Sequence, residues 1–152
     1  MPVWVRTKWR AMVEAENKKS MTSFKDLEVY QNSYKACIKV MTQIVPSLPE
    51  SEKFDLKHQL SESAKAIPRL IAEGYAKRHQ RHGFQKYLDD AMAECNETIV
   101  GMEMCKDIFG GYVDIKLCEE LVRMYDVCGR QLYRLRDAWG RFSKEKSPKV
   151  KG

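Results

Sequence analysis

Cysteine and histidine are the residue types of this chain best suited to nucleophilic or metal chemistry, but their spacing supports neither. The five cysteines are odd in number and form no Cys-x-x-Cys pair, so neither a disulfide framework nor a zinc site is expected. Three of them lie at apolar positions of helical patterns, which predicts small core residues with reduced thiols: Cys37, Cys95 and Cys128. His79 and His82 lie in a run of basic residues, whose positive charge disfavours a bound metal ion.

Catalytic motifs are also missing from the sequence. It contains no Glu-x-x-His pair of the kind that holds two metal ions in helical bundles. It also contains no phosphate-binding loop, dinucleotide fingerprint or nucleophile elbow. We therefore expect a protein that is not an enzyme and that needs no cofactor and no metal.

Basic residues, by contrast, recur at regular spacing toward the C-terminal end. Steps of seven, seven, four and seven residues place five of them on one helix face: Lys116, Arg123, Arg130, Arg134 and Arg141. Arg123 follows the apolar Leu121 by two residues, about 200° around the helix, so this face points away from the core. Such a row of cations can bind nucleic-acid phosphates. A shorter basic group in a turn is a second candidate: Lys77, Arg78 and Arg81.

The same row of cations also fits a simpler interpretation. Glu119–Arg123 and Asp126–Arg130 have the four-residue spacing of intrahelical ion pairs. Runs of charge are most often solvated helix faces. Both interpretations stay open on the sequence alone.

The net charge is concentrated at the two ends of the chain. The 152 residues contain 27 Lys and Arg against 21 Asp and Glu, a formal charge of +6. Residues 1–20 and residues 143–152 each carry +3, which leaves the middle neutral. Basic tails either attract nucleic acid or keep a protein soluble.

These boundaries predict three parts. We expect residues 1–20 to be a poorly ordered extension, with Met21 as an alternative natural start, residues 21–142 to be one domain, and residues 143–152 to be a basic tail. No apolar run reaches the roughly 18 residues of a membrane span, and the first 20 residues lack a secretory signal. Together with reduced cysteines, this predicts a cytoplasmic protein that does not contact the membrane.

Four stretches of apolar residues at helical spacing must position these side chains. They cover residues 27–48, 54–71, 84–109 and 117–139, with the second helix beginning near residue 50. Tyr34 and Ile38 belong to the first stripe and Phe54 to the second. Short loops separate the helices and no strand pattern competes, so neighbouring helices run antiparallel. The sequence therefore predicts an all-α fold, an antiparallel up-down-up-down four-helix bundle.

Local signals mark the helix ends and one irregularity. Ser47 or Ser51 is placed to cap the second helix, Asp114 is placed to cap the fourth, and glycines 110–111 end the third. Pro68 lies inside the second pattern, which resumes at once, so we expect one helix that is kinked at the proline.

The apolar surface of the second helix is wider than one core contact requires. Ile67, Leu70 and Ile71 cover more than a third of the circumference, which predicts either an oligomer interface or contact with two neighbouring helices. Gln59 and Glu73 lie on the same helix, where a buried carboxylate would need a partner.

These segments resemble a known family, the four-helix-bundle proteins encoded in intervening sequences of bacterial 23S rRNA genes. The resemblance covers residues 24–142, and Ile-Pro-x-x-Ile-Ala-Glu-Gly at residues 67–74 is its most specific part. Other matches are FKDLEVY at residues 24–30, Leu56, Gln59 and Leu60, and, on the third helix, Tyr87-Leu88, Ala91, Glu94 and Asn96-Glu97. Glu94 replaces a serine that is common in the family.

The resemblance implies an antiparallel bundle that assembles as a ring-shaped homo-oligomer, usually a homopentamer. A related branch serves as the accessory protein of diversity-generating retroelements and binds nucleic acid and a reverse transcriptase. We therefore expect an accessory role with RNA or DNA as partner. The alternative is a scaffold without nucleic-acid affinity that binds a partner protein through residues 67–71 or Trp139.

Overall fold

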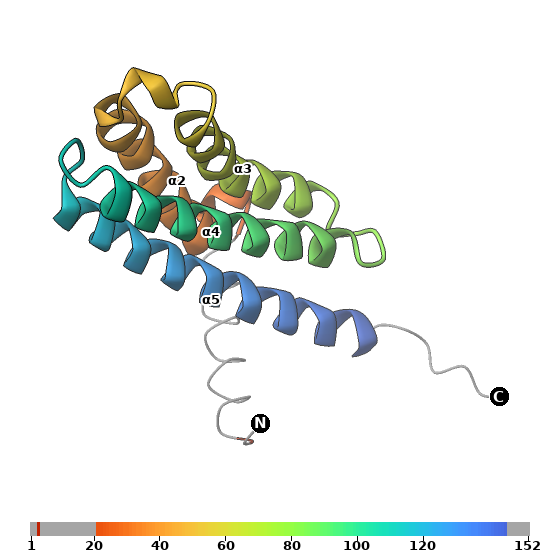
Figure 1. Ribbon diagram of the computed structural model, residues 1–152. Coiled ribbons are helices and arrows are strands. Elements are labelled where there is room, and N and C mark those ends of the chain that lie inside the picture. The colour runs from red at the N-terminus through yellow and green to blue at the C-terminus, as the bar shows by residue number, and fades with distance from the viewer. Residues whose placement is uncertain (1–2, 4–20, 146–152) are drawn as a thin grey trace.

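Four long helices pack side by side in the computed structural model, which describes residues 3 and 21–145, with side chains for residues 3 and 21–141 (Figure 1). The helices are α2 (Glu28–Lys39), α3 (Leu56–Ala76), α4 (Gly83–Ile108) and α5 (Ile115–Glu145). α3 packs against α2 and α4, and α5 packs against α4 and α2, which closes the bundle. Neighbours run antiparallel, and the described residues contain no strand. The predicted all-α four-helix bundle is confirmed.

Short helical turns precede α2 and join it to α3. They are η1 (Phe24–Asp26), a π-helical turn η2 (Val40–Ile44), and the 3-10 turns η3 (Val45–Ser47) and η4 (Glu50–Glu52). Pro46 and Pro49 bracket this change of direction, because proline has no backbone N–H with which to continue a helix. α3 therefore begins at Leu56, later than the expected start near residue 50.

Carboxylate side chains, rather than serine hydroxyls, accept hydrogen bonds from the backbone N–H groups in the first turns of α3 and α5. The Asp114 carboxylate accepts from the backbone N–H of Leu117 at 3.1 Å, which confirms the predicted cap of α5. At α3 the Glu52 carboxylate accepts from the N–H of Leu56 at 3.2 Å. Ser47 instead donates its hydroxyl to a carbonyl four residues earlier, so the predicted serine cap is wrong.

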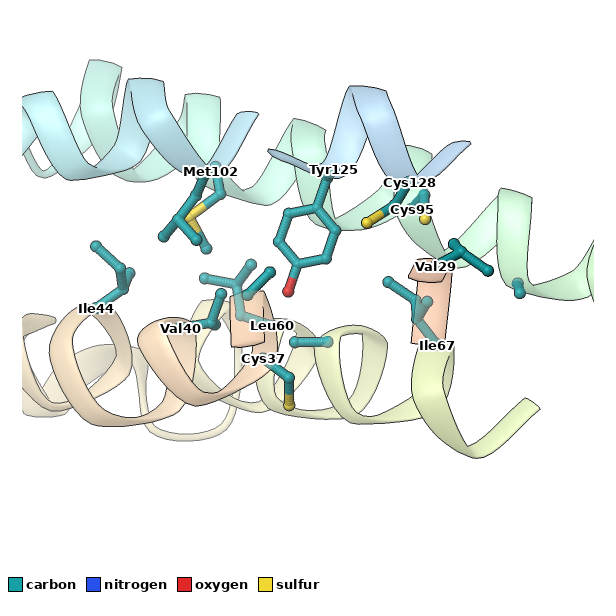
Figure 2. Close-up of a cluster of buried hydrophobic side chains, with 14 of the residues drawn as sticks. Val29, Cys37, Val40, Ile44, Leu60, Ile67, Cys95, Met102, Tyr125 and Cys128 are labelled. Atoms are coloured by element: carbon teal, nitrogen blue, oxygen red, sulfur yellow. The ribbon is translucent and has the colours of Figure 1, made fainter. Parts of the chain in front are cut away.

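The core lies between all four helices and is drawn in part in Figure 2. The apolar stripes of α4 and α5 enter it as predicted except at Ile108, which is 65% exposed, and Leu88, Met102 and Leu132 are fully buried. The ring of Tyr125 extends from α5 toward α2 and α3, close to Cys37. All five cysteines are buried and free, in accordance with the prediction of reduced core thiols.

The face that α2 turns to the core is shifted from its predicted stripe: Cys37 is buried as predicted, but Tyr34 and Ile38 are not. Tyr34 and Ile38 are 50% and 46% exposed, while Val29, Ser33 and Ala36 are buried. Two apolar stripes run side by side on this helix. The stripe with small residues faces inward because small side chains allow helices to approach closely. Phe54, which was also predicted to be buried, is 88% exposed in the turn before α3.

α3 is one helix across Pro68, as predicted, and the proline is buried within it. The kink at this residue stays a prediction. Gln59 and Glu73 are exposed rather than buried, so neither needs a partner inside the fold. The concern about a buried carboxylate is thereby removed.

The ends of the chain are only partly described. α5 continues to Glu145, so the first three residues of the predicted tail are helical. The remainder of that tail, and residues 1–20 apart from Val3, lie outside the described residues. Within residues 21–145, no helix combines the length and apolarity that crossing a membrane requires.

Candidate nucleic-acid interface

The row of cations on α5 has the orientation that its spacing predicted. All five side chains are exposed, while Leu121, Tyr125 and Cys128 on the opposite face are buried. The members of the row are Lys116, Arg123, Arg130, Arg134 and Arg141. A flat ligand could therefore reach several of them from one side of α5.

Two cations of this row have acidic partners on their own helix. The Nη2 atom of Arg130 is 2.7 Å from Oδ2 of Asp126, and the Nη2 atom of Arg141 is 3.0 Å from Oδ2 of Asp137. Exposed pairs of this kind are worth well under ~1 kcal/mol, so a phosphate can compete for both guanidinium groups. The other predicted pair does not form: within the described residues, Arg123 has no ion pair.

The second basic group is partly held by aromatic rings. The ammonium of Lys77 lies 4.8 Å from the centre of the Tyr87 ring and donates to its hydroxyl, and this hydrogen bond raises the pKa of Lys77. The guanidinium of Arg78 lies 4.1 Å from the ring centre of Tyr75. Arg81 is exposed. This second group therefore lies just beyond the end of α3, with two of its three cations against aromatic rings.

Tertiary packing brings the two basic groups to the same end of the bundle. The turn between α3 and α4 lies beside the C-terminal end of α5 (Figure 1). Phe84 and Trp139 form an edge-to-face pair with ring centres 5.0 Å apart. Arg136 of α5 donates from Nε to the Oδ1 atom of Asp89 on α4 at 2.6 Å, which forms an ion pair between the two helices. These contacts hold the C-terminal end of α5 beside the basic turn, although about 60 residues separate the two in the chain.

Charge is therefore unevenly divided along the bundle. At the end just described, residues 69–90 and 130–141 contain nine Lys and Arg against four Asp and Glu. At the opposite end, residues 39–57 and 103–120 contain five Lys and Arg against eight Asp and Glu. Lys116 lies at this acidic end, so it is far from Arg134 and Arg141, which lie in the C-terminal half of α5. We call the first end, with residues 69–90 and 130–141, the basic end.

A groove of about 420 Å³ runs between α4 and α5 beside the row of cations. Its lining residues come from α4 and α5 and include one acidic side chain: Met92, Asn96 and Ile99 of α4, and Tyr125, Asp126, Gly129, Arg130, Tyr133 and Arg134 of α5. Sequence reasoning found the two arginines but missed the α4 residues. No sequence signal marks them, because their proximity to α5 follows from helix packing alone.

The residues predicted as an oligomer interface lie mainly in the core. Ile67 and Ile71 are fully buried within the single chain, and Leu70 packs partly against the core. The structure thus places this apolar face against neighbouring helices, and no surface of either isoleucine is left for a second copy. Trp139, the other predicted contact for a partner, is partly buried against Phe84.

Apolar side chains are exposed elsewhere, on two other helices. Tyr34 and Ile38 form a patch on α2, and Val100, Met104 and Ile108 recur every four residues on α4. We call these the α2 patch and the α4 stripe. α2 and α4 are diagonal in the bundle, since each packs mainly against α3 and α5.

The titratable groups of the core are poorly suited to chemistry. Burial raises the pKa of the Cys105 thiol to about 12 and that of Cys128 to about 11, and it raises the pKa of Cys95 as well. A protonated thiol is a weak nucleophile. Among the described residues, no cluster of His, Cys, Asp or Glu side chains is arranged to hold a metal ion.

The fold and this surface define a small antiparallel four-helix-bundle protein with one basic end. Residues 25–134 match the family model described as 23S rRNA-intervening sequence protein. The chain belongs to this family, as the segment at residues 67–74 predicted. No curated protein sequence matches the chain.

Proposed function

We propose that this protein is a cytoplasmic, non-enzymatic accessory protein that binds nucleic acid through its basic end and the outer face of α5. The supporting observation is that the turn at residues 77–81 lies beside the C-terminal end of α5, the helix that carries Arg130, Arg134 and Arg141 on its exposed face. Two weak basic groups that lie apart in the sequence are thereby carried by neighbouring parts of the fold. The buried, free cysteines fit a reducing compartment, and their raised pKa values fit the absence of a thiol nucleophile.

Phosphate contacts by exposed cations have a measurable signature. Each one releases counterions, so the logarithm of the affinity falls with the logarithm of salt with a slope of about −0.9 per contact for duplex DNA. The basic tails would add further contacts. The affinity of this kind of binding falls steeply as the salt concentration rises, and it depends little on the nucleotide sequence.

The test is a titration of labelled RNA and DNA with the full chain at several salt concentrations. The variant Arg130→Glu/Arg134→Glu should weaken binding to all sequences and reduce the salt slope by roughly 1.5 to 2. The matched control Lys35→Glu/Lys53→Glu makes the same change in net charge at exposed lysines outside this surface. Equal losses in both variants would show that only net charge matters. Unchanged binding in the first variant would contradict the proposal.

A second candidate function is assembly, either as a ring of identical chains or as a scaffold for a partner protein. Two different apolar surfaces on diagonal helices favour it: the α2 patch and the α4 stripe. Contact between unlike patches of successive copies is heterologous, and it closes into a ring when the rotation is suitable. A ring would also multiply the weak basic surface by the number of subunits.

Light scattering of the full chain tests this assembly. Val100→Glu/Met104→Glu should reduce the particle mass to that of one chain, because it places two charges in the contact. Val127→Glu is the control, since Val127 is an exposed apolar residue of α5 outside both surfaces. A wild-type protein that is already monomeric, or an unchanged mass in the double variant, would contradict the ring.

A further inference from the structure

Gly129 lies in the interior of α5, and no close packing contact requires a glycine at this position. A Cβ atom built there meets nothing within 4 Å. At two other helical glycines a Cβ would collide, at 2.7 Å from Tyr87 Cβ for Gly74 and 2.5 Å from Leu60 Cδ2 for Gly101. Glycine destabilises a helix interior relative to alanine. Gly129 therefore lowers the stability of α5, and no contact within the chain that depends on the open space offsets this loss.

This open space belongs to the groove between α4 and α5. The groove measures about 420 Å³, within the range of small-molecule sites. A side chain at position 129 would project into it, whereas glycine leaves the backbone of α5 accessible. The absence of a side chain therefore determines how deep the groove is.

Three groups around Gly129 differ in chemistry and complement one another. Tyr133 is 62% exposed and offers an aromatic face. Arg134 has no acidic partner among the described residues, and Asn96 contributes an exposed amide. Single-stranded nucleic acid is bound by this combination: aromatic rings stack on bases, cations contact phosphates, and amides bond the edges of unpaired bases.

We propose that the α4–α5 groove holds an unpaired base of single-stranded nucleic acid, stacked on Tyr133 above Gly129, with Arg134 on a neighbouring phosphate. This rests on the proposed function, because it names the class of nucleic acid that the same face of α5 binds. Bases of a duplex are stacked on one another inside the helix and cannot enter the groove. The protein should therefore prefer a single strand to a duplex of the same charge.

A second copy of the chain is the weaker occupant for this groove. A protein contact over the groove would have to bury Arg134, which has no acidic partner among the described residues, and burying an unpaired charge is costly. The exposed apolar surfaces that suit a protein contact lie elsewhere, in the α2 patch and the α4 stripe. Occupation by a second copy is an outcome that the experiment distinguishes.

The experiment measures fluorescence anisotropy of a short labelled oligouridine and of a labelled RNA duplex with the full chain. Gly129→Leu fills the groove, and Tyr133→Ala removes the stacking face. Each should weaken oligouridine binding roughly tenfold, the magnitude of one lost base–aromatic stack, and leave duplex binding within about twofold. Tyr112→Ala is the matched control, since Tyr112 is a tyrosine of the opposite end that is 61% exposed, and it should change neither affinity.

Three results would overturn the groove site. Gly129→Leu could bind oligouridine like wild type, or lose single-strand and duplex binding equally, or change the particle mass, which would assign the space to a second copy. Circular dichroism confirms that the variant is folded, as expected where no neighbour lies within 4 Å of a Cβ. If wild type binds neither RNA, the proposed function fails as well. If only the charge-reversed Arg130→Glu/Arg134→Glu loses affinity, the basic surface stands and the groove site falls.

Discussion

Alanine at Gly74 and alanine at Gly129 should change the stability of the bundle in opposite directions, although both glycines lie inside helices. At Gly74 of α3, the new Cβ would be 2.7 Å from the Cβ of Tyr87 and 3.0 Å from Cδ2 of Phe84. At Gly129 of α5 it would meet nothing within 4 Å. The two substitutions are chemically identical and differ only in their surroundings.

The magnitudes follow from two opposing terms. Glycine to alanine in a helix interior stabilises by about 1 kcal/mol, and at Gly129 this is the whole effect. At Gly74 the Cβ of Tyr87 is fixed to the backbone of α4, so a change of rotamer cannot relieve the collision and the helices must separate. Overpacking of this kind costs about 1–3 kcal/mol. Gly74→Ala should therefore destabilise by up to about 2 kcal/mol after the helix-propensity gain is subtracted.

Thermal and urea denaturation of the full chain, followed by circular dichroism, measures both effects. A change of 1 kcal/mol moves the Tm by roughly 3–5 °C for a domain of this size. Protein concentration is held equal for all samples, because assembly would make the Tm depend on it. If Gly74→Ala is as stable as Gly129→Ala, the close approach of α3 and α4 is wrong. If Gly129→Ala destabilises instead, another group fills the space above it.

Two further predictions concern polar groups in and near the core. The hydroxyl of Tyr125 is buried and has no hydrogen-bond partner among the described residues, so Tyr125→Phe should stabilise by roughly 1 kcal/mol in a urea titration; a loss of similar size would reveal a partner. Burial, and then repulsion from Glu97 and other nearby carboxylates, raises the pKa of Glu94 above 4.5. The native state thus holds this proton more tightly, and the stability that protonation provides is lost as pH rises through the raised pKa. Glu94→Gln should raise the Tm at about pH 7 but not below about pH 4, and an equal gain at both would exclude titration as the cause.

The long C-terminal helix was predictable because its apolar and charged residues alternate without ambiguity. Leu121 follows Leu117 by four residues and Leu132 follows Leu121 by eleven, about one and three helical turns, and all three are buried. The same periodicity placed the row of cations on the outer face. α2 was only partly predictable in this way, since Cys37 of its predicted stripe is buried, whereas Tyr34 and Ile38 are exposed and a neighbouring apolar stripe is buried instead. Periodicity identifies a helix, but it does not decide which of two stripes faces inward.

For the candidate interface, sequence reasoning found the cations but not their arrangement. Spacing along α5 grouped Lys116 with Arg141, yet the structure puts Lys116 at the acidic end of the bundle. The turn at residues 77–81 was a separate candidate until packing placed it beside the end of α5. Periodicity acts along one helix, whereas electrostatic potential depends on distances between helices. Charge on different helices can therefore be summed only in the folded chain.

The sequence by itself determined the helices, their antiparallel order, the family and the outward direction of the α5 cations. These follow from local rules: helical period, capping residues and short connections. Only the tertiary structure decided that Ile67 and Ile71 are core residues and that α4 completes a groove with Gly129 and Tyr133. The physical reason is that burial and grooves are properties of two or more surfaces in contact, and one helix's pattern describes only its own.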